Sequence, residues 1–77
     1  MASRVRASTL ELARHVTRAV YESADGQFGR WRRLSTIKGA TVASVLYAAE
    51  QGWIKLEGGR SACLTEEGRK MIAREAN

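Results

Sequence analysis

A double glycine stands between two short runs of alternating residues, in the stretch WIKLEGGRSACL, and this arrangement strongly limits the possible folds of the chain. Each run is long enough for a short strand, and the second begins directly after the loop. Glycine adopts the backbone angles of tight turns at little steric cost, so the stretch predicts a β-hairpin. Any fold of this chain therefore has to accommodate a hairpin near its C-terminal end.

The hydrophobic pattern selects the length of the hairpin loop. A loop of three residues, 58–60, places the large aliphatic side chains of both strands on one face, whereas a two-residue loop leaves Leu64 on the wrong face. Lys55 and Cys63 are then expected to face outward, with Arg60 at the tip. The predicted cross-strand pairs are Ile54 with Leu64 and Leu56 with Ala62.

Helical patterns lie on both sides of the hairpin. The clearest covers residues 8–24, which begin with the capping box STLE, carry one apolar stripe and end at the sequence Asp25-Gly26. Thr65 is an expected N-cap for a last helix, in which two glutamates suit the first turn and Met71 and Ile72 provide the docking side chains. Gly68 in this helix would permit a close approach to its neighbour.

The region between the first helix and the hairpin is predicted to hold two further helices. Apolar residues recur every three positions from Trp31 to Ile37, which favours a short helix, and a second helix is expected over residues 40–51 after a turn at residues 38–40. In that second helix the predicted buried residues are Val42, Val45, Leu46 and Ala49. The predicted outward residues are Ala40, Ala43, Ser44, Tyr47 and Gln51, with Thr41 at the N-terminal edge.

The positive charge of the chain is concentrated in one block. The net charge is +5, and residues 26–48 contribute +4 because they contain four basic residues and no acidic residue. Two more arginines, Arg4 and Arg6, lie in a basic N-terminal segment, residues 1–7, that we expect to be flexible. A basic block without acids is typical of a surface that binds polyanions, although it also fits a solvated face that only keeps the protein soluble.

Composition excludes several classes of protein. With 77 residues and 44% apolar residues, the sequence predicts one small globular domain, residues 8–77. The single cysteine, Cys63, favours the reducing cytoplasm, and no apolar run approaches the roughly 20 residues of a membrane span. The single histidine, His15, has no catalytic or metal-binding partners at a recognisable spacing. We expect a cytoplasmic protein that is not an enzyme and binds no metal or cofactor.

The order of the expected elements resembles the winged helix-turn-helix superfamily from about Ser8 to Ile72. The segment TVASVLYAAEQGWI resembles the third helix and its exit into the wing, and LTEEGRK resembles the start of the last helix in many bacterial repressors. The resemblance implies an α+β winged-helix fold with a three-helix helix-turn-helix core, a two-stranded wing and a C-terminal helix. It also implies that the third helix docks in the major groove of DNA and that the wing contacts the backbone.

Two functions follow as expectations. The first is a small bacterial or phage-type transcriptional regulator that binds double-stranded DNA, with a homodimer as a possible arrangement on paired half-sites. The second is a winged-helix module that binds a protein partner through helix 40–51 without reading DNA. The predicted DNA-binding residues are Arg30, Arg32, Arg33, Lys38, Thr41, Ser44, Tyr47, Lys55 and Arg60.

Overall fold

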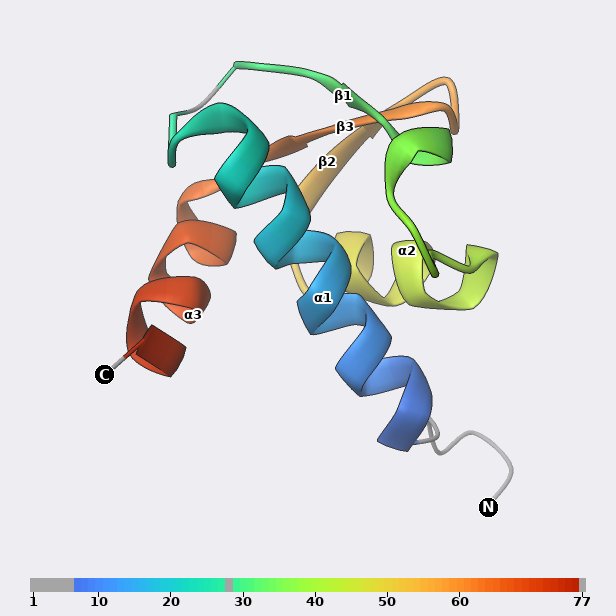
Figure 1. Cartoon of the computed structure of the whole chain (residues 1–77), viewed down its shortest axis with the longest axis horizontal. Coiled ribbons are helices and arrows are strands. Elements are labelled where there is room, and N and C mark those ends of the chain that lie inside the picture. The colour runs from blue at the N-terminus through green and yellow to red at the C-terminus, as the bar shows by residue number, and fades with distance from the viewer. Residues whose placement is uncertain (1–6, 28, 77) are drawn as a thin grey trace.

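The computed structural model describes residues 7–27 and 29–76, which form three α-helices and a three-stranded antiparallel sheet (Figure 1). The chain is therefore of the α+β class. The elements are α1 (Ala7–Ala24), β1 (Arg32–Arg33), a 3-10 turn η1 (Leu34–Thr36), α2 (Val42–Glu50), β2 (Ile54–Glu57), β3 (Ser61–Leu64) and α3 (Glu66–Ala76). The predicted basic segment lies outside the described residues, apart from Ala7, which begins α1. Phe28 also lies outside them.

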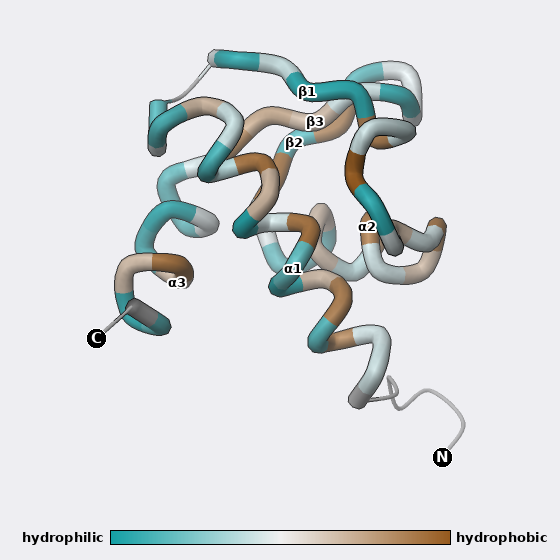
Figure 2. Tube along the Cα trace, in the orientation of Figure 1, coloured by the Kyte–Doolittle hydropathy of each residue, from teal (hydrophilic) through white to brown (hydrophobic). Residues whose placement is uncertain are grey.

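Helix α1 has the buried stripe that its sequence predicts. Hydrophobic and hydrophilic residues alternate along it with a helical period (Figure 2), and Ala13, Val16 and Val20 are fully buried. Thr17 is buried as well, because its hydroxyl donates to the carbonyl oxygen of Ala13 at 2.9 Å and so loses no hydrogen bond. The helix ends where predicted, at Asp25 and Gly26, which both have positive φ angles.

The hairpin has the predicted register and gains a third strand. Ile54 pairs with Leu64 and Leu56 pairs with Ala62, which confirms the three-residue loop. Strand β1 adds to the other side of β3, so that the strand order is β1-β3-β2 and β3 is central. The expectation that Cys63 faces outward is wrong, because its side chain is only 4% exposed. Neighbouring residues of a strand point to opposite faces, so the burial of Ala62, Cys63 and Leu64 means that both faces of β3 are covered.

The predicted helix over residues 31–37 does not form. In its place the chain makes strand β1 and the single turn η1, in which the amide of Ile37 donates to the carbonyl oxygen of Leu34 at 3.0 Å. The three-residue spacing of apolar side chains that suggested an α-helix suits this i,i+3 bonding better. The amide of Leu34 donates to the carbonyl oxygen of Arg60 at 2.8 Å, which keeps the segment beside the hairpin.

Helix α3 begins and docks as predicted. The amide of Gly68 donates to the hydroxyl of Thr65 at 3.0 Å, and that hydroxyl donates in turn to the carbonyl oxygen of Gly52. Met71 and Ile72 are both buried. Gly68 lies so close to the backbone of Trp53 that a Cβ atom on it would be 2.1 Å from the Trp53 carbonyl oxygen. The start of α3 is therefore held against the entry of the hairpin by a contact that only glycine permits.

The main core is built between α1, α2 and the hairpin. Its buried residues are Ala13, Val16, Val20, Ile37, Val45, Ala48, Ile54, Ala62 and Leu64. None of the helices formed by the described residues is long and apolar enough to cross a membrane.

We expect Gly68→Ala to destabilise the protein by about 2–4 kcal/mol, because the new methyl group collides with a backbone atom that cannot rotate away. Urea denaturation followed by tryptophan fluorescence measures the change. Glu67→Ala, on the same turn but exposed, is the matched control and should change the free energy of unfolding by about 0.5 kcal/mol or less. A Gly68→Ala variant as stable as the parent would show that α3 does not approach the hairpin this closely.

Candidate functional site

The exposed side of α2 differs from the predicted one. Ser44 is fully buried and Val45 is 8% exposed, whereas Val42 is 79% exposed and Leu46 is 50% exposed. Of the four residues expected to be buried only Val45 is, and Ala48, which was not predicted, is buried too. The phase assigned from the apolar residues is therefore wrong, and the exposed residues of α2 are aliphatic apart from Glu50 at its C-terminal end.

Local hydrogen bonding explains why a serine takes the buried position. Thr41 is the N-cap of α2, and its hydroxyl accepts from the amide of Ser44 at 3.1 Å. The hydroxyl of Ser44 accepts from the amide of Thr41 at 2.9 Å and lies 2.9 Å from the carbonyl oxygen of Thr41. This capping box satisfies every polar atom of the Ser44 side chain within one turn, so its burial costs no hydrogen bond. Ser44 consequently has no free group to offer to DNA.

Tyr47 lies between the buried and the exposed sides of α2. Its ring is half-buried, packs against the main core and meets the ring of Trp53 edge-on, with ring centroids 6.0 Å apart and an interplanar angle of 70°. The tyrosine therefore supports the junction between α2 and β2. It does not stand at the centre of the exposed side of α2, where the predicted phase placed it.

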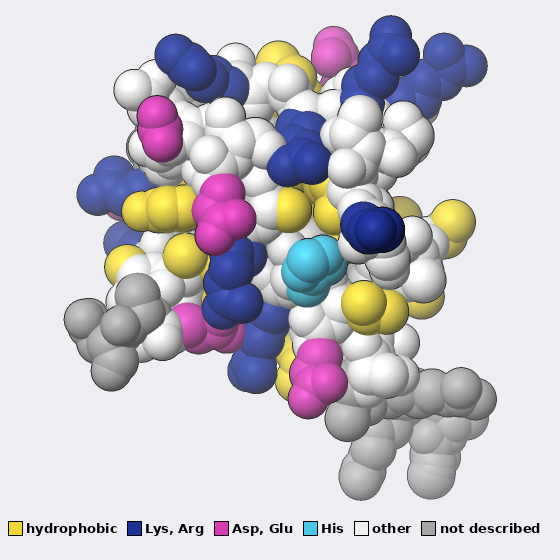
Figure 3. Space-filling model, viewed as in Figure 1, with side chains coloured by type: hydrophobic (Ala, Val, Ile, Leu, Met, Phe, Trp, Pro, Cys, Tyr) yellow, Lys and Arg dark blue, Asp and Glu magenta, His cyan; other side chains and the backbone are white. Residues whose placement is uncertain are grey.

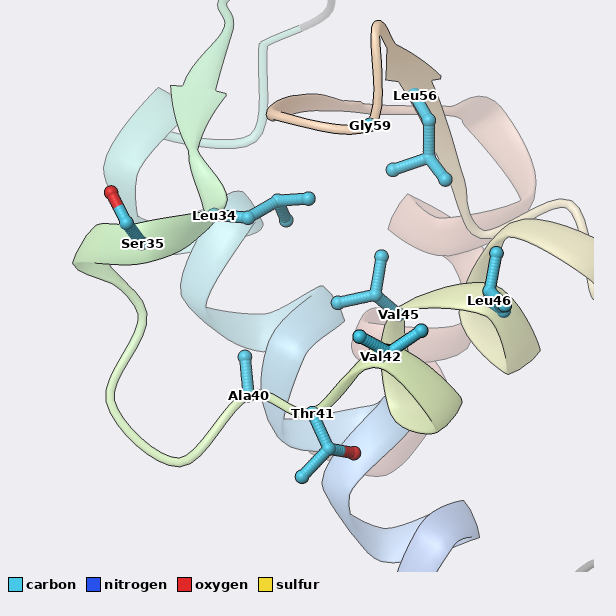
Figure 4. A pocket seen from close by; sticks show the side chains of 9 residues that line it. All are labelled: Leu34, Ser35, Ala40, Thr41, Val42, Val45, Leu46, Leu56 and Gly59. Atoms are coloured by element: carbon cyan, nitrogen blue, oxygen red, sulfur yellow. The ribbon is translucent and has the colours of Figure 1, made fainter.

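An apolar groove lies beside the exposed side of α2 (Figure 4). Its volume is about 350 Å³. Leu34 from η1 and Leu56 from β2 point into the groove from opposite sides, above Val45. Val42 and Leu46 line it where α2 meets solvent. The full lining is Leu34, Ser35, Ala40, Thr41, Val42, Val45, Leu46, Leu56 and Gly59. We call this the α2 groove.

Five of the predicted cationic residues are exposed and, among the residues that the structure describes, form no ion pair or side-chain hydrogen bond. They are Arg30, Arg33, Lys38, Lys55 and Arg60. Arg33 and Arg60 line one shallow hollow together with Leu34, Ser35, Gly59 and Ser61. The space-filling view shows basic side chains gathered at the corner of the molecule formed by the hairpin loop (Figure 3). The structure therefore brings cations from β1 and from the hairpin tip to one place.

Arg32 has a different role from the one predicted. Its guanidinium donates to the hydroxyl and the carbonyl oxygen of Thr36, at 3.0 and 2.9 Å, and to the carbonyl oxygen of Ala19 at 3.1 Å. It also donates to the hydroxyl of Ser23. The half-buried side chain thus joins α1 to η1 and is not available to a phosphate. The guanidinium fork suits this task because it presents several donors in a fixed plane.

The sequence reasoning missed the α2 groove. The apolar spacing predicts a helix around Leu34 that does not form, and it predicts that Val42 and Leu46 are buried, whereas both are exposed. One signal was available: the spacing of Thr41 and Ser44 matches a capping box, which starts the helix at Val42 and turns Ser44 inward. No sequence pattern indicates that Leu56 lines the groove, because this depends on where β2 lies relative to η1.

The remaining polar groups form structural contacts. His15 Nε2 lies 3.1 Å from the carbonyl oxygen of Lys38, so the histidine connects α1 to the loop before α2. Arg18 pairs with Glu75 of α3 at 2.6 Å, and not with Glu22 as its spacing suggests. Within residues 7–27 and 29–76 no group of three or more His, Cys, Asp or Glu side chains is placed to hold a metal ion.

Comparison with protein-family models, with curated proteins and with solved structures gives no match for this chain.

We expect Arg32→Ala to lower the free energy of unfolding by about 1–3 kcal/mol, because it leaves the acceptors of α1 and η1 without their shared donor. Urea denaturation measures this loss. Arg33→Ala removes the same charge from the exposed neighbouring position, and its effect on stability should stay within about 0.5 kcal/mol. Equal stability of the two variants would contradict the structural role of Arg32.

Proposed function

We propose that this protein is a small winged-helix DNA-binding protein that acts in transcription regulation. The order of elements supports the proposal: a first α-helix, a short strand, a 3-10 turn, a second α-helix, a hairpin and a last α-helix. This order is compatible with a winged helix in which η1 replaces the usual second helix. In that arrangement α2 is the helix presented to the major groove, and the β2–β3 hairpin is the wing.

One observation carries the proposal: exposed cations that form no ion pair within residues 7–27 and 29–76 gather beside α2 and at the hairpin tip. Arg33 and Arg60 share one hollow, and Lys38 precedes α2 by only a few residues. The N-terminal end of a helix also carries partial positive charge, and no acidic residue lies in the first turn of α2. Phosphate groups along duplex DNA would find several positive partners on this side.

The composition of α2 predicts how such binding would discriminate between sequences. Its exposed residues are Val42, Ala43, Leu46 and Glu50, and the first three have no hydrogen-bond donor or acceptor in their side chains. Aliphatic side chains can contact the methyl group of thymine but cannot read guanine or adenine edges. We therefore propose binding dominated by the phosphate backbone, with little discrimination between base sequences.

A second candidate function is favoured by the same aliphatic surface. The exposed Val42 and Leu46 suit an interface with another protein better than they suit water, because apolar residues beside a groove often mark binding sites. In this alternative the protein is an adaptor or co-regulator that does not bind DNA directly.

Titration of the protein with a short DNA duplex tests the first candidate. We expect affinity to fall steeply as salt rises, and Arg33→Ala and Arg60→Ala should each reduce the slope of log K against log salt by about one unit. Fluorescence anisotropy of labelled DNA at several salt concentrations provides the measurement.

Arg74→Ala is the matched control for this titration, since it removes the same charge from the exposed side of α3, far from the hairpin loop (Figure 1). Its salt slope should equal that of the parent. If all three variants lose affinity equally, only net charge matters and there is no DNA-binding surface at the hairpin. If the parent binds no DNA at low salt, the proposal fails.

A further inference from the structure

The α2 groove exposes more apolar surface than the DNA-binding proposal requires. Phosphate contacts need cations and donors, yet six of the nine residues that line the groove have aliphatic side chains and none is charged. Val42 and Leu46 extend the same apolar surface outward along α2, where they are 79% and 50% exposed. Its volume of about 350 Å³ is near the lower end of the roughly 300–1,000 Å³ typical of ligand pockets, so it can take a few side chains.

A charged hollow continues the groove on the side of the hairpin tip. Leu34, Ser35 and Gly59 line both concavities, so the two are adjacent. The hollow adds Arg33 and Arg60, which form no ion pair with any residue in the described part of the chain. No acidic residue lines either concavity. A ligand that fills both would place apolar groups over α2 and a negative group beside the arginines.

We propose that the α2 groove and the adjoining hollow bind a short peptide segment of a partner protein, with large apolar side chains in the groove and a carboxylate between Arg33 and Arg60. Arginine suits the second task because its guanidinium can donate two parallel hydrogen bonds to one carboxylate. The inference goes beyond DNA binding and gives the second candidate function a partner of defined chemistry.

The charge of the hollow favours an acidic peptide over a second copy of the chain as the molecule that binds here. In a two-fold symmetric dimer the same patch contacts itself, so a dimer through this face would enclose the arginines of both copies in one interface. Four unneutralised guanidinium groups at one interface would repel each other, and the chain has a net charge of +5. An acidic and apolar peptide would neutralise Arg33 and Arg60, whereas a second copy of the chain would repel them.

Selection from a yeast-displayed library of short random peptides tests the proposal, with the fluorescently labelled protein as bait. We expect the selected peptides to contain at least one Asp or Glu beside two or more large apolar residues. A synthetic copy of a selected peptide is then measured by fluorescence anisotropy against the parent and its variants. No nucleic acid enters this measurement, so its outcome is independent of the DNA titration.

Leu46→Lys places a charge at the edge of the groove and should weaken binding of the selected peptide by at least about tenfold. Arg60→Glu should also weaken it, since it puts a like charge beside the carboxylate. Arg74→Glu makes the same change of charge on α3 and should leave the affinity within about twofold of the parent. Circular dichroism checks that each variant is folded, which we expect because all three positions are exposed.

Three outcomes would overturn the inference. The library could yield no peptide that binds the parent better than Leu46→Lys, which would show that the groove has no ligand of this kind. The selected peptides could lack acidic residues and bind Arg60→Glu as well as the parent, which would remove the role of the arginines. Alternatively, Arg74→Glu could weaken binding as much as Arg60→Glu, which would leave only non-specific attraction.

Discussion

The position of the segment between α1 and α2, which provides one side of the α2 groove, depends on the hydrogen bonds of Arg32. One guanidinium bonds to the carbonyl oxygen of Ala19 in α1 and to two oxygens of Thr36 at the end of η1. Because β1 is only two residues long and η1 is a single turn, this clamp adds to the few other contacts of the segment between α1 and α2, which include the hydrogen bond from Leu34 to Arg60 and the buried side chain of Ile37. The Arg32 clamp and the pairing of β1 with β3 together place Leu34 opposite Leu56 across the α2 groove.

Two neighbouring arginines, Arg32 and Arg33, have different surroundings. Arg32 is half-buried and uses its donors within the protein, whereas Arg33 is exposed and shares a hollow with Arg60. Successive residues of a strand point to opposite faces, so adjacent positions in one basic run necessarily meet different surroundings. A block of positive charge is therefore a poor guide to the number of cations that can contact a ligand. Of the basic residues, only the exposed ones enter the DNA-binding proposal and the peptide-binding proposal.

The candidate site was predicted less well than the fold because its surface depends on one helix rotation. The apolar pattern predicts that Val42 and Leu46 face the core. Ser44 takes the buried side of α2 instead, because its hydroxyl has its hydrogen-bond partners within the same turn. A nine-residue helix has few turns over which a stripe can be averaged, so a single residue shifts its apparent phase. Arg33 and Arg60 are both exposed, and they reach a common hollow only because β1 pairs with β3.

The sequence by itself determined the features that depend on neighbouring residues. These are the C-terminal end of α1, the hairpin register and the cap at Thr65. Each follows from local backbone geometry or from an alternation that a one-residue slip would invert. Only the tertiary structure decided that residues 32–33 form a strand, that Cys63 is buried and that Val42 faces solvent. These outcomes depend on contacts between segments distant in sequence, such as Arg32 with Ala19 and β1 with β3, whose free energies outweigh weak local preferences.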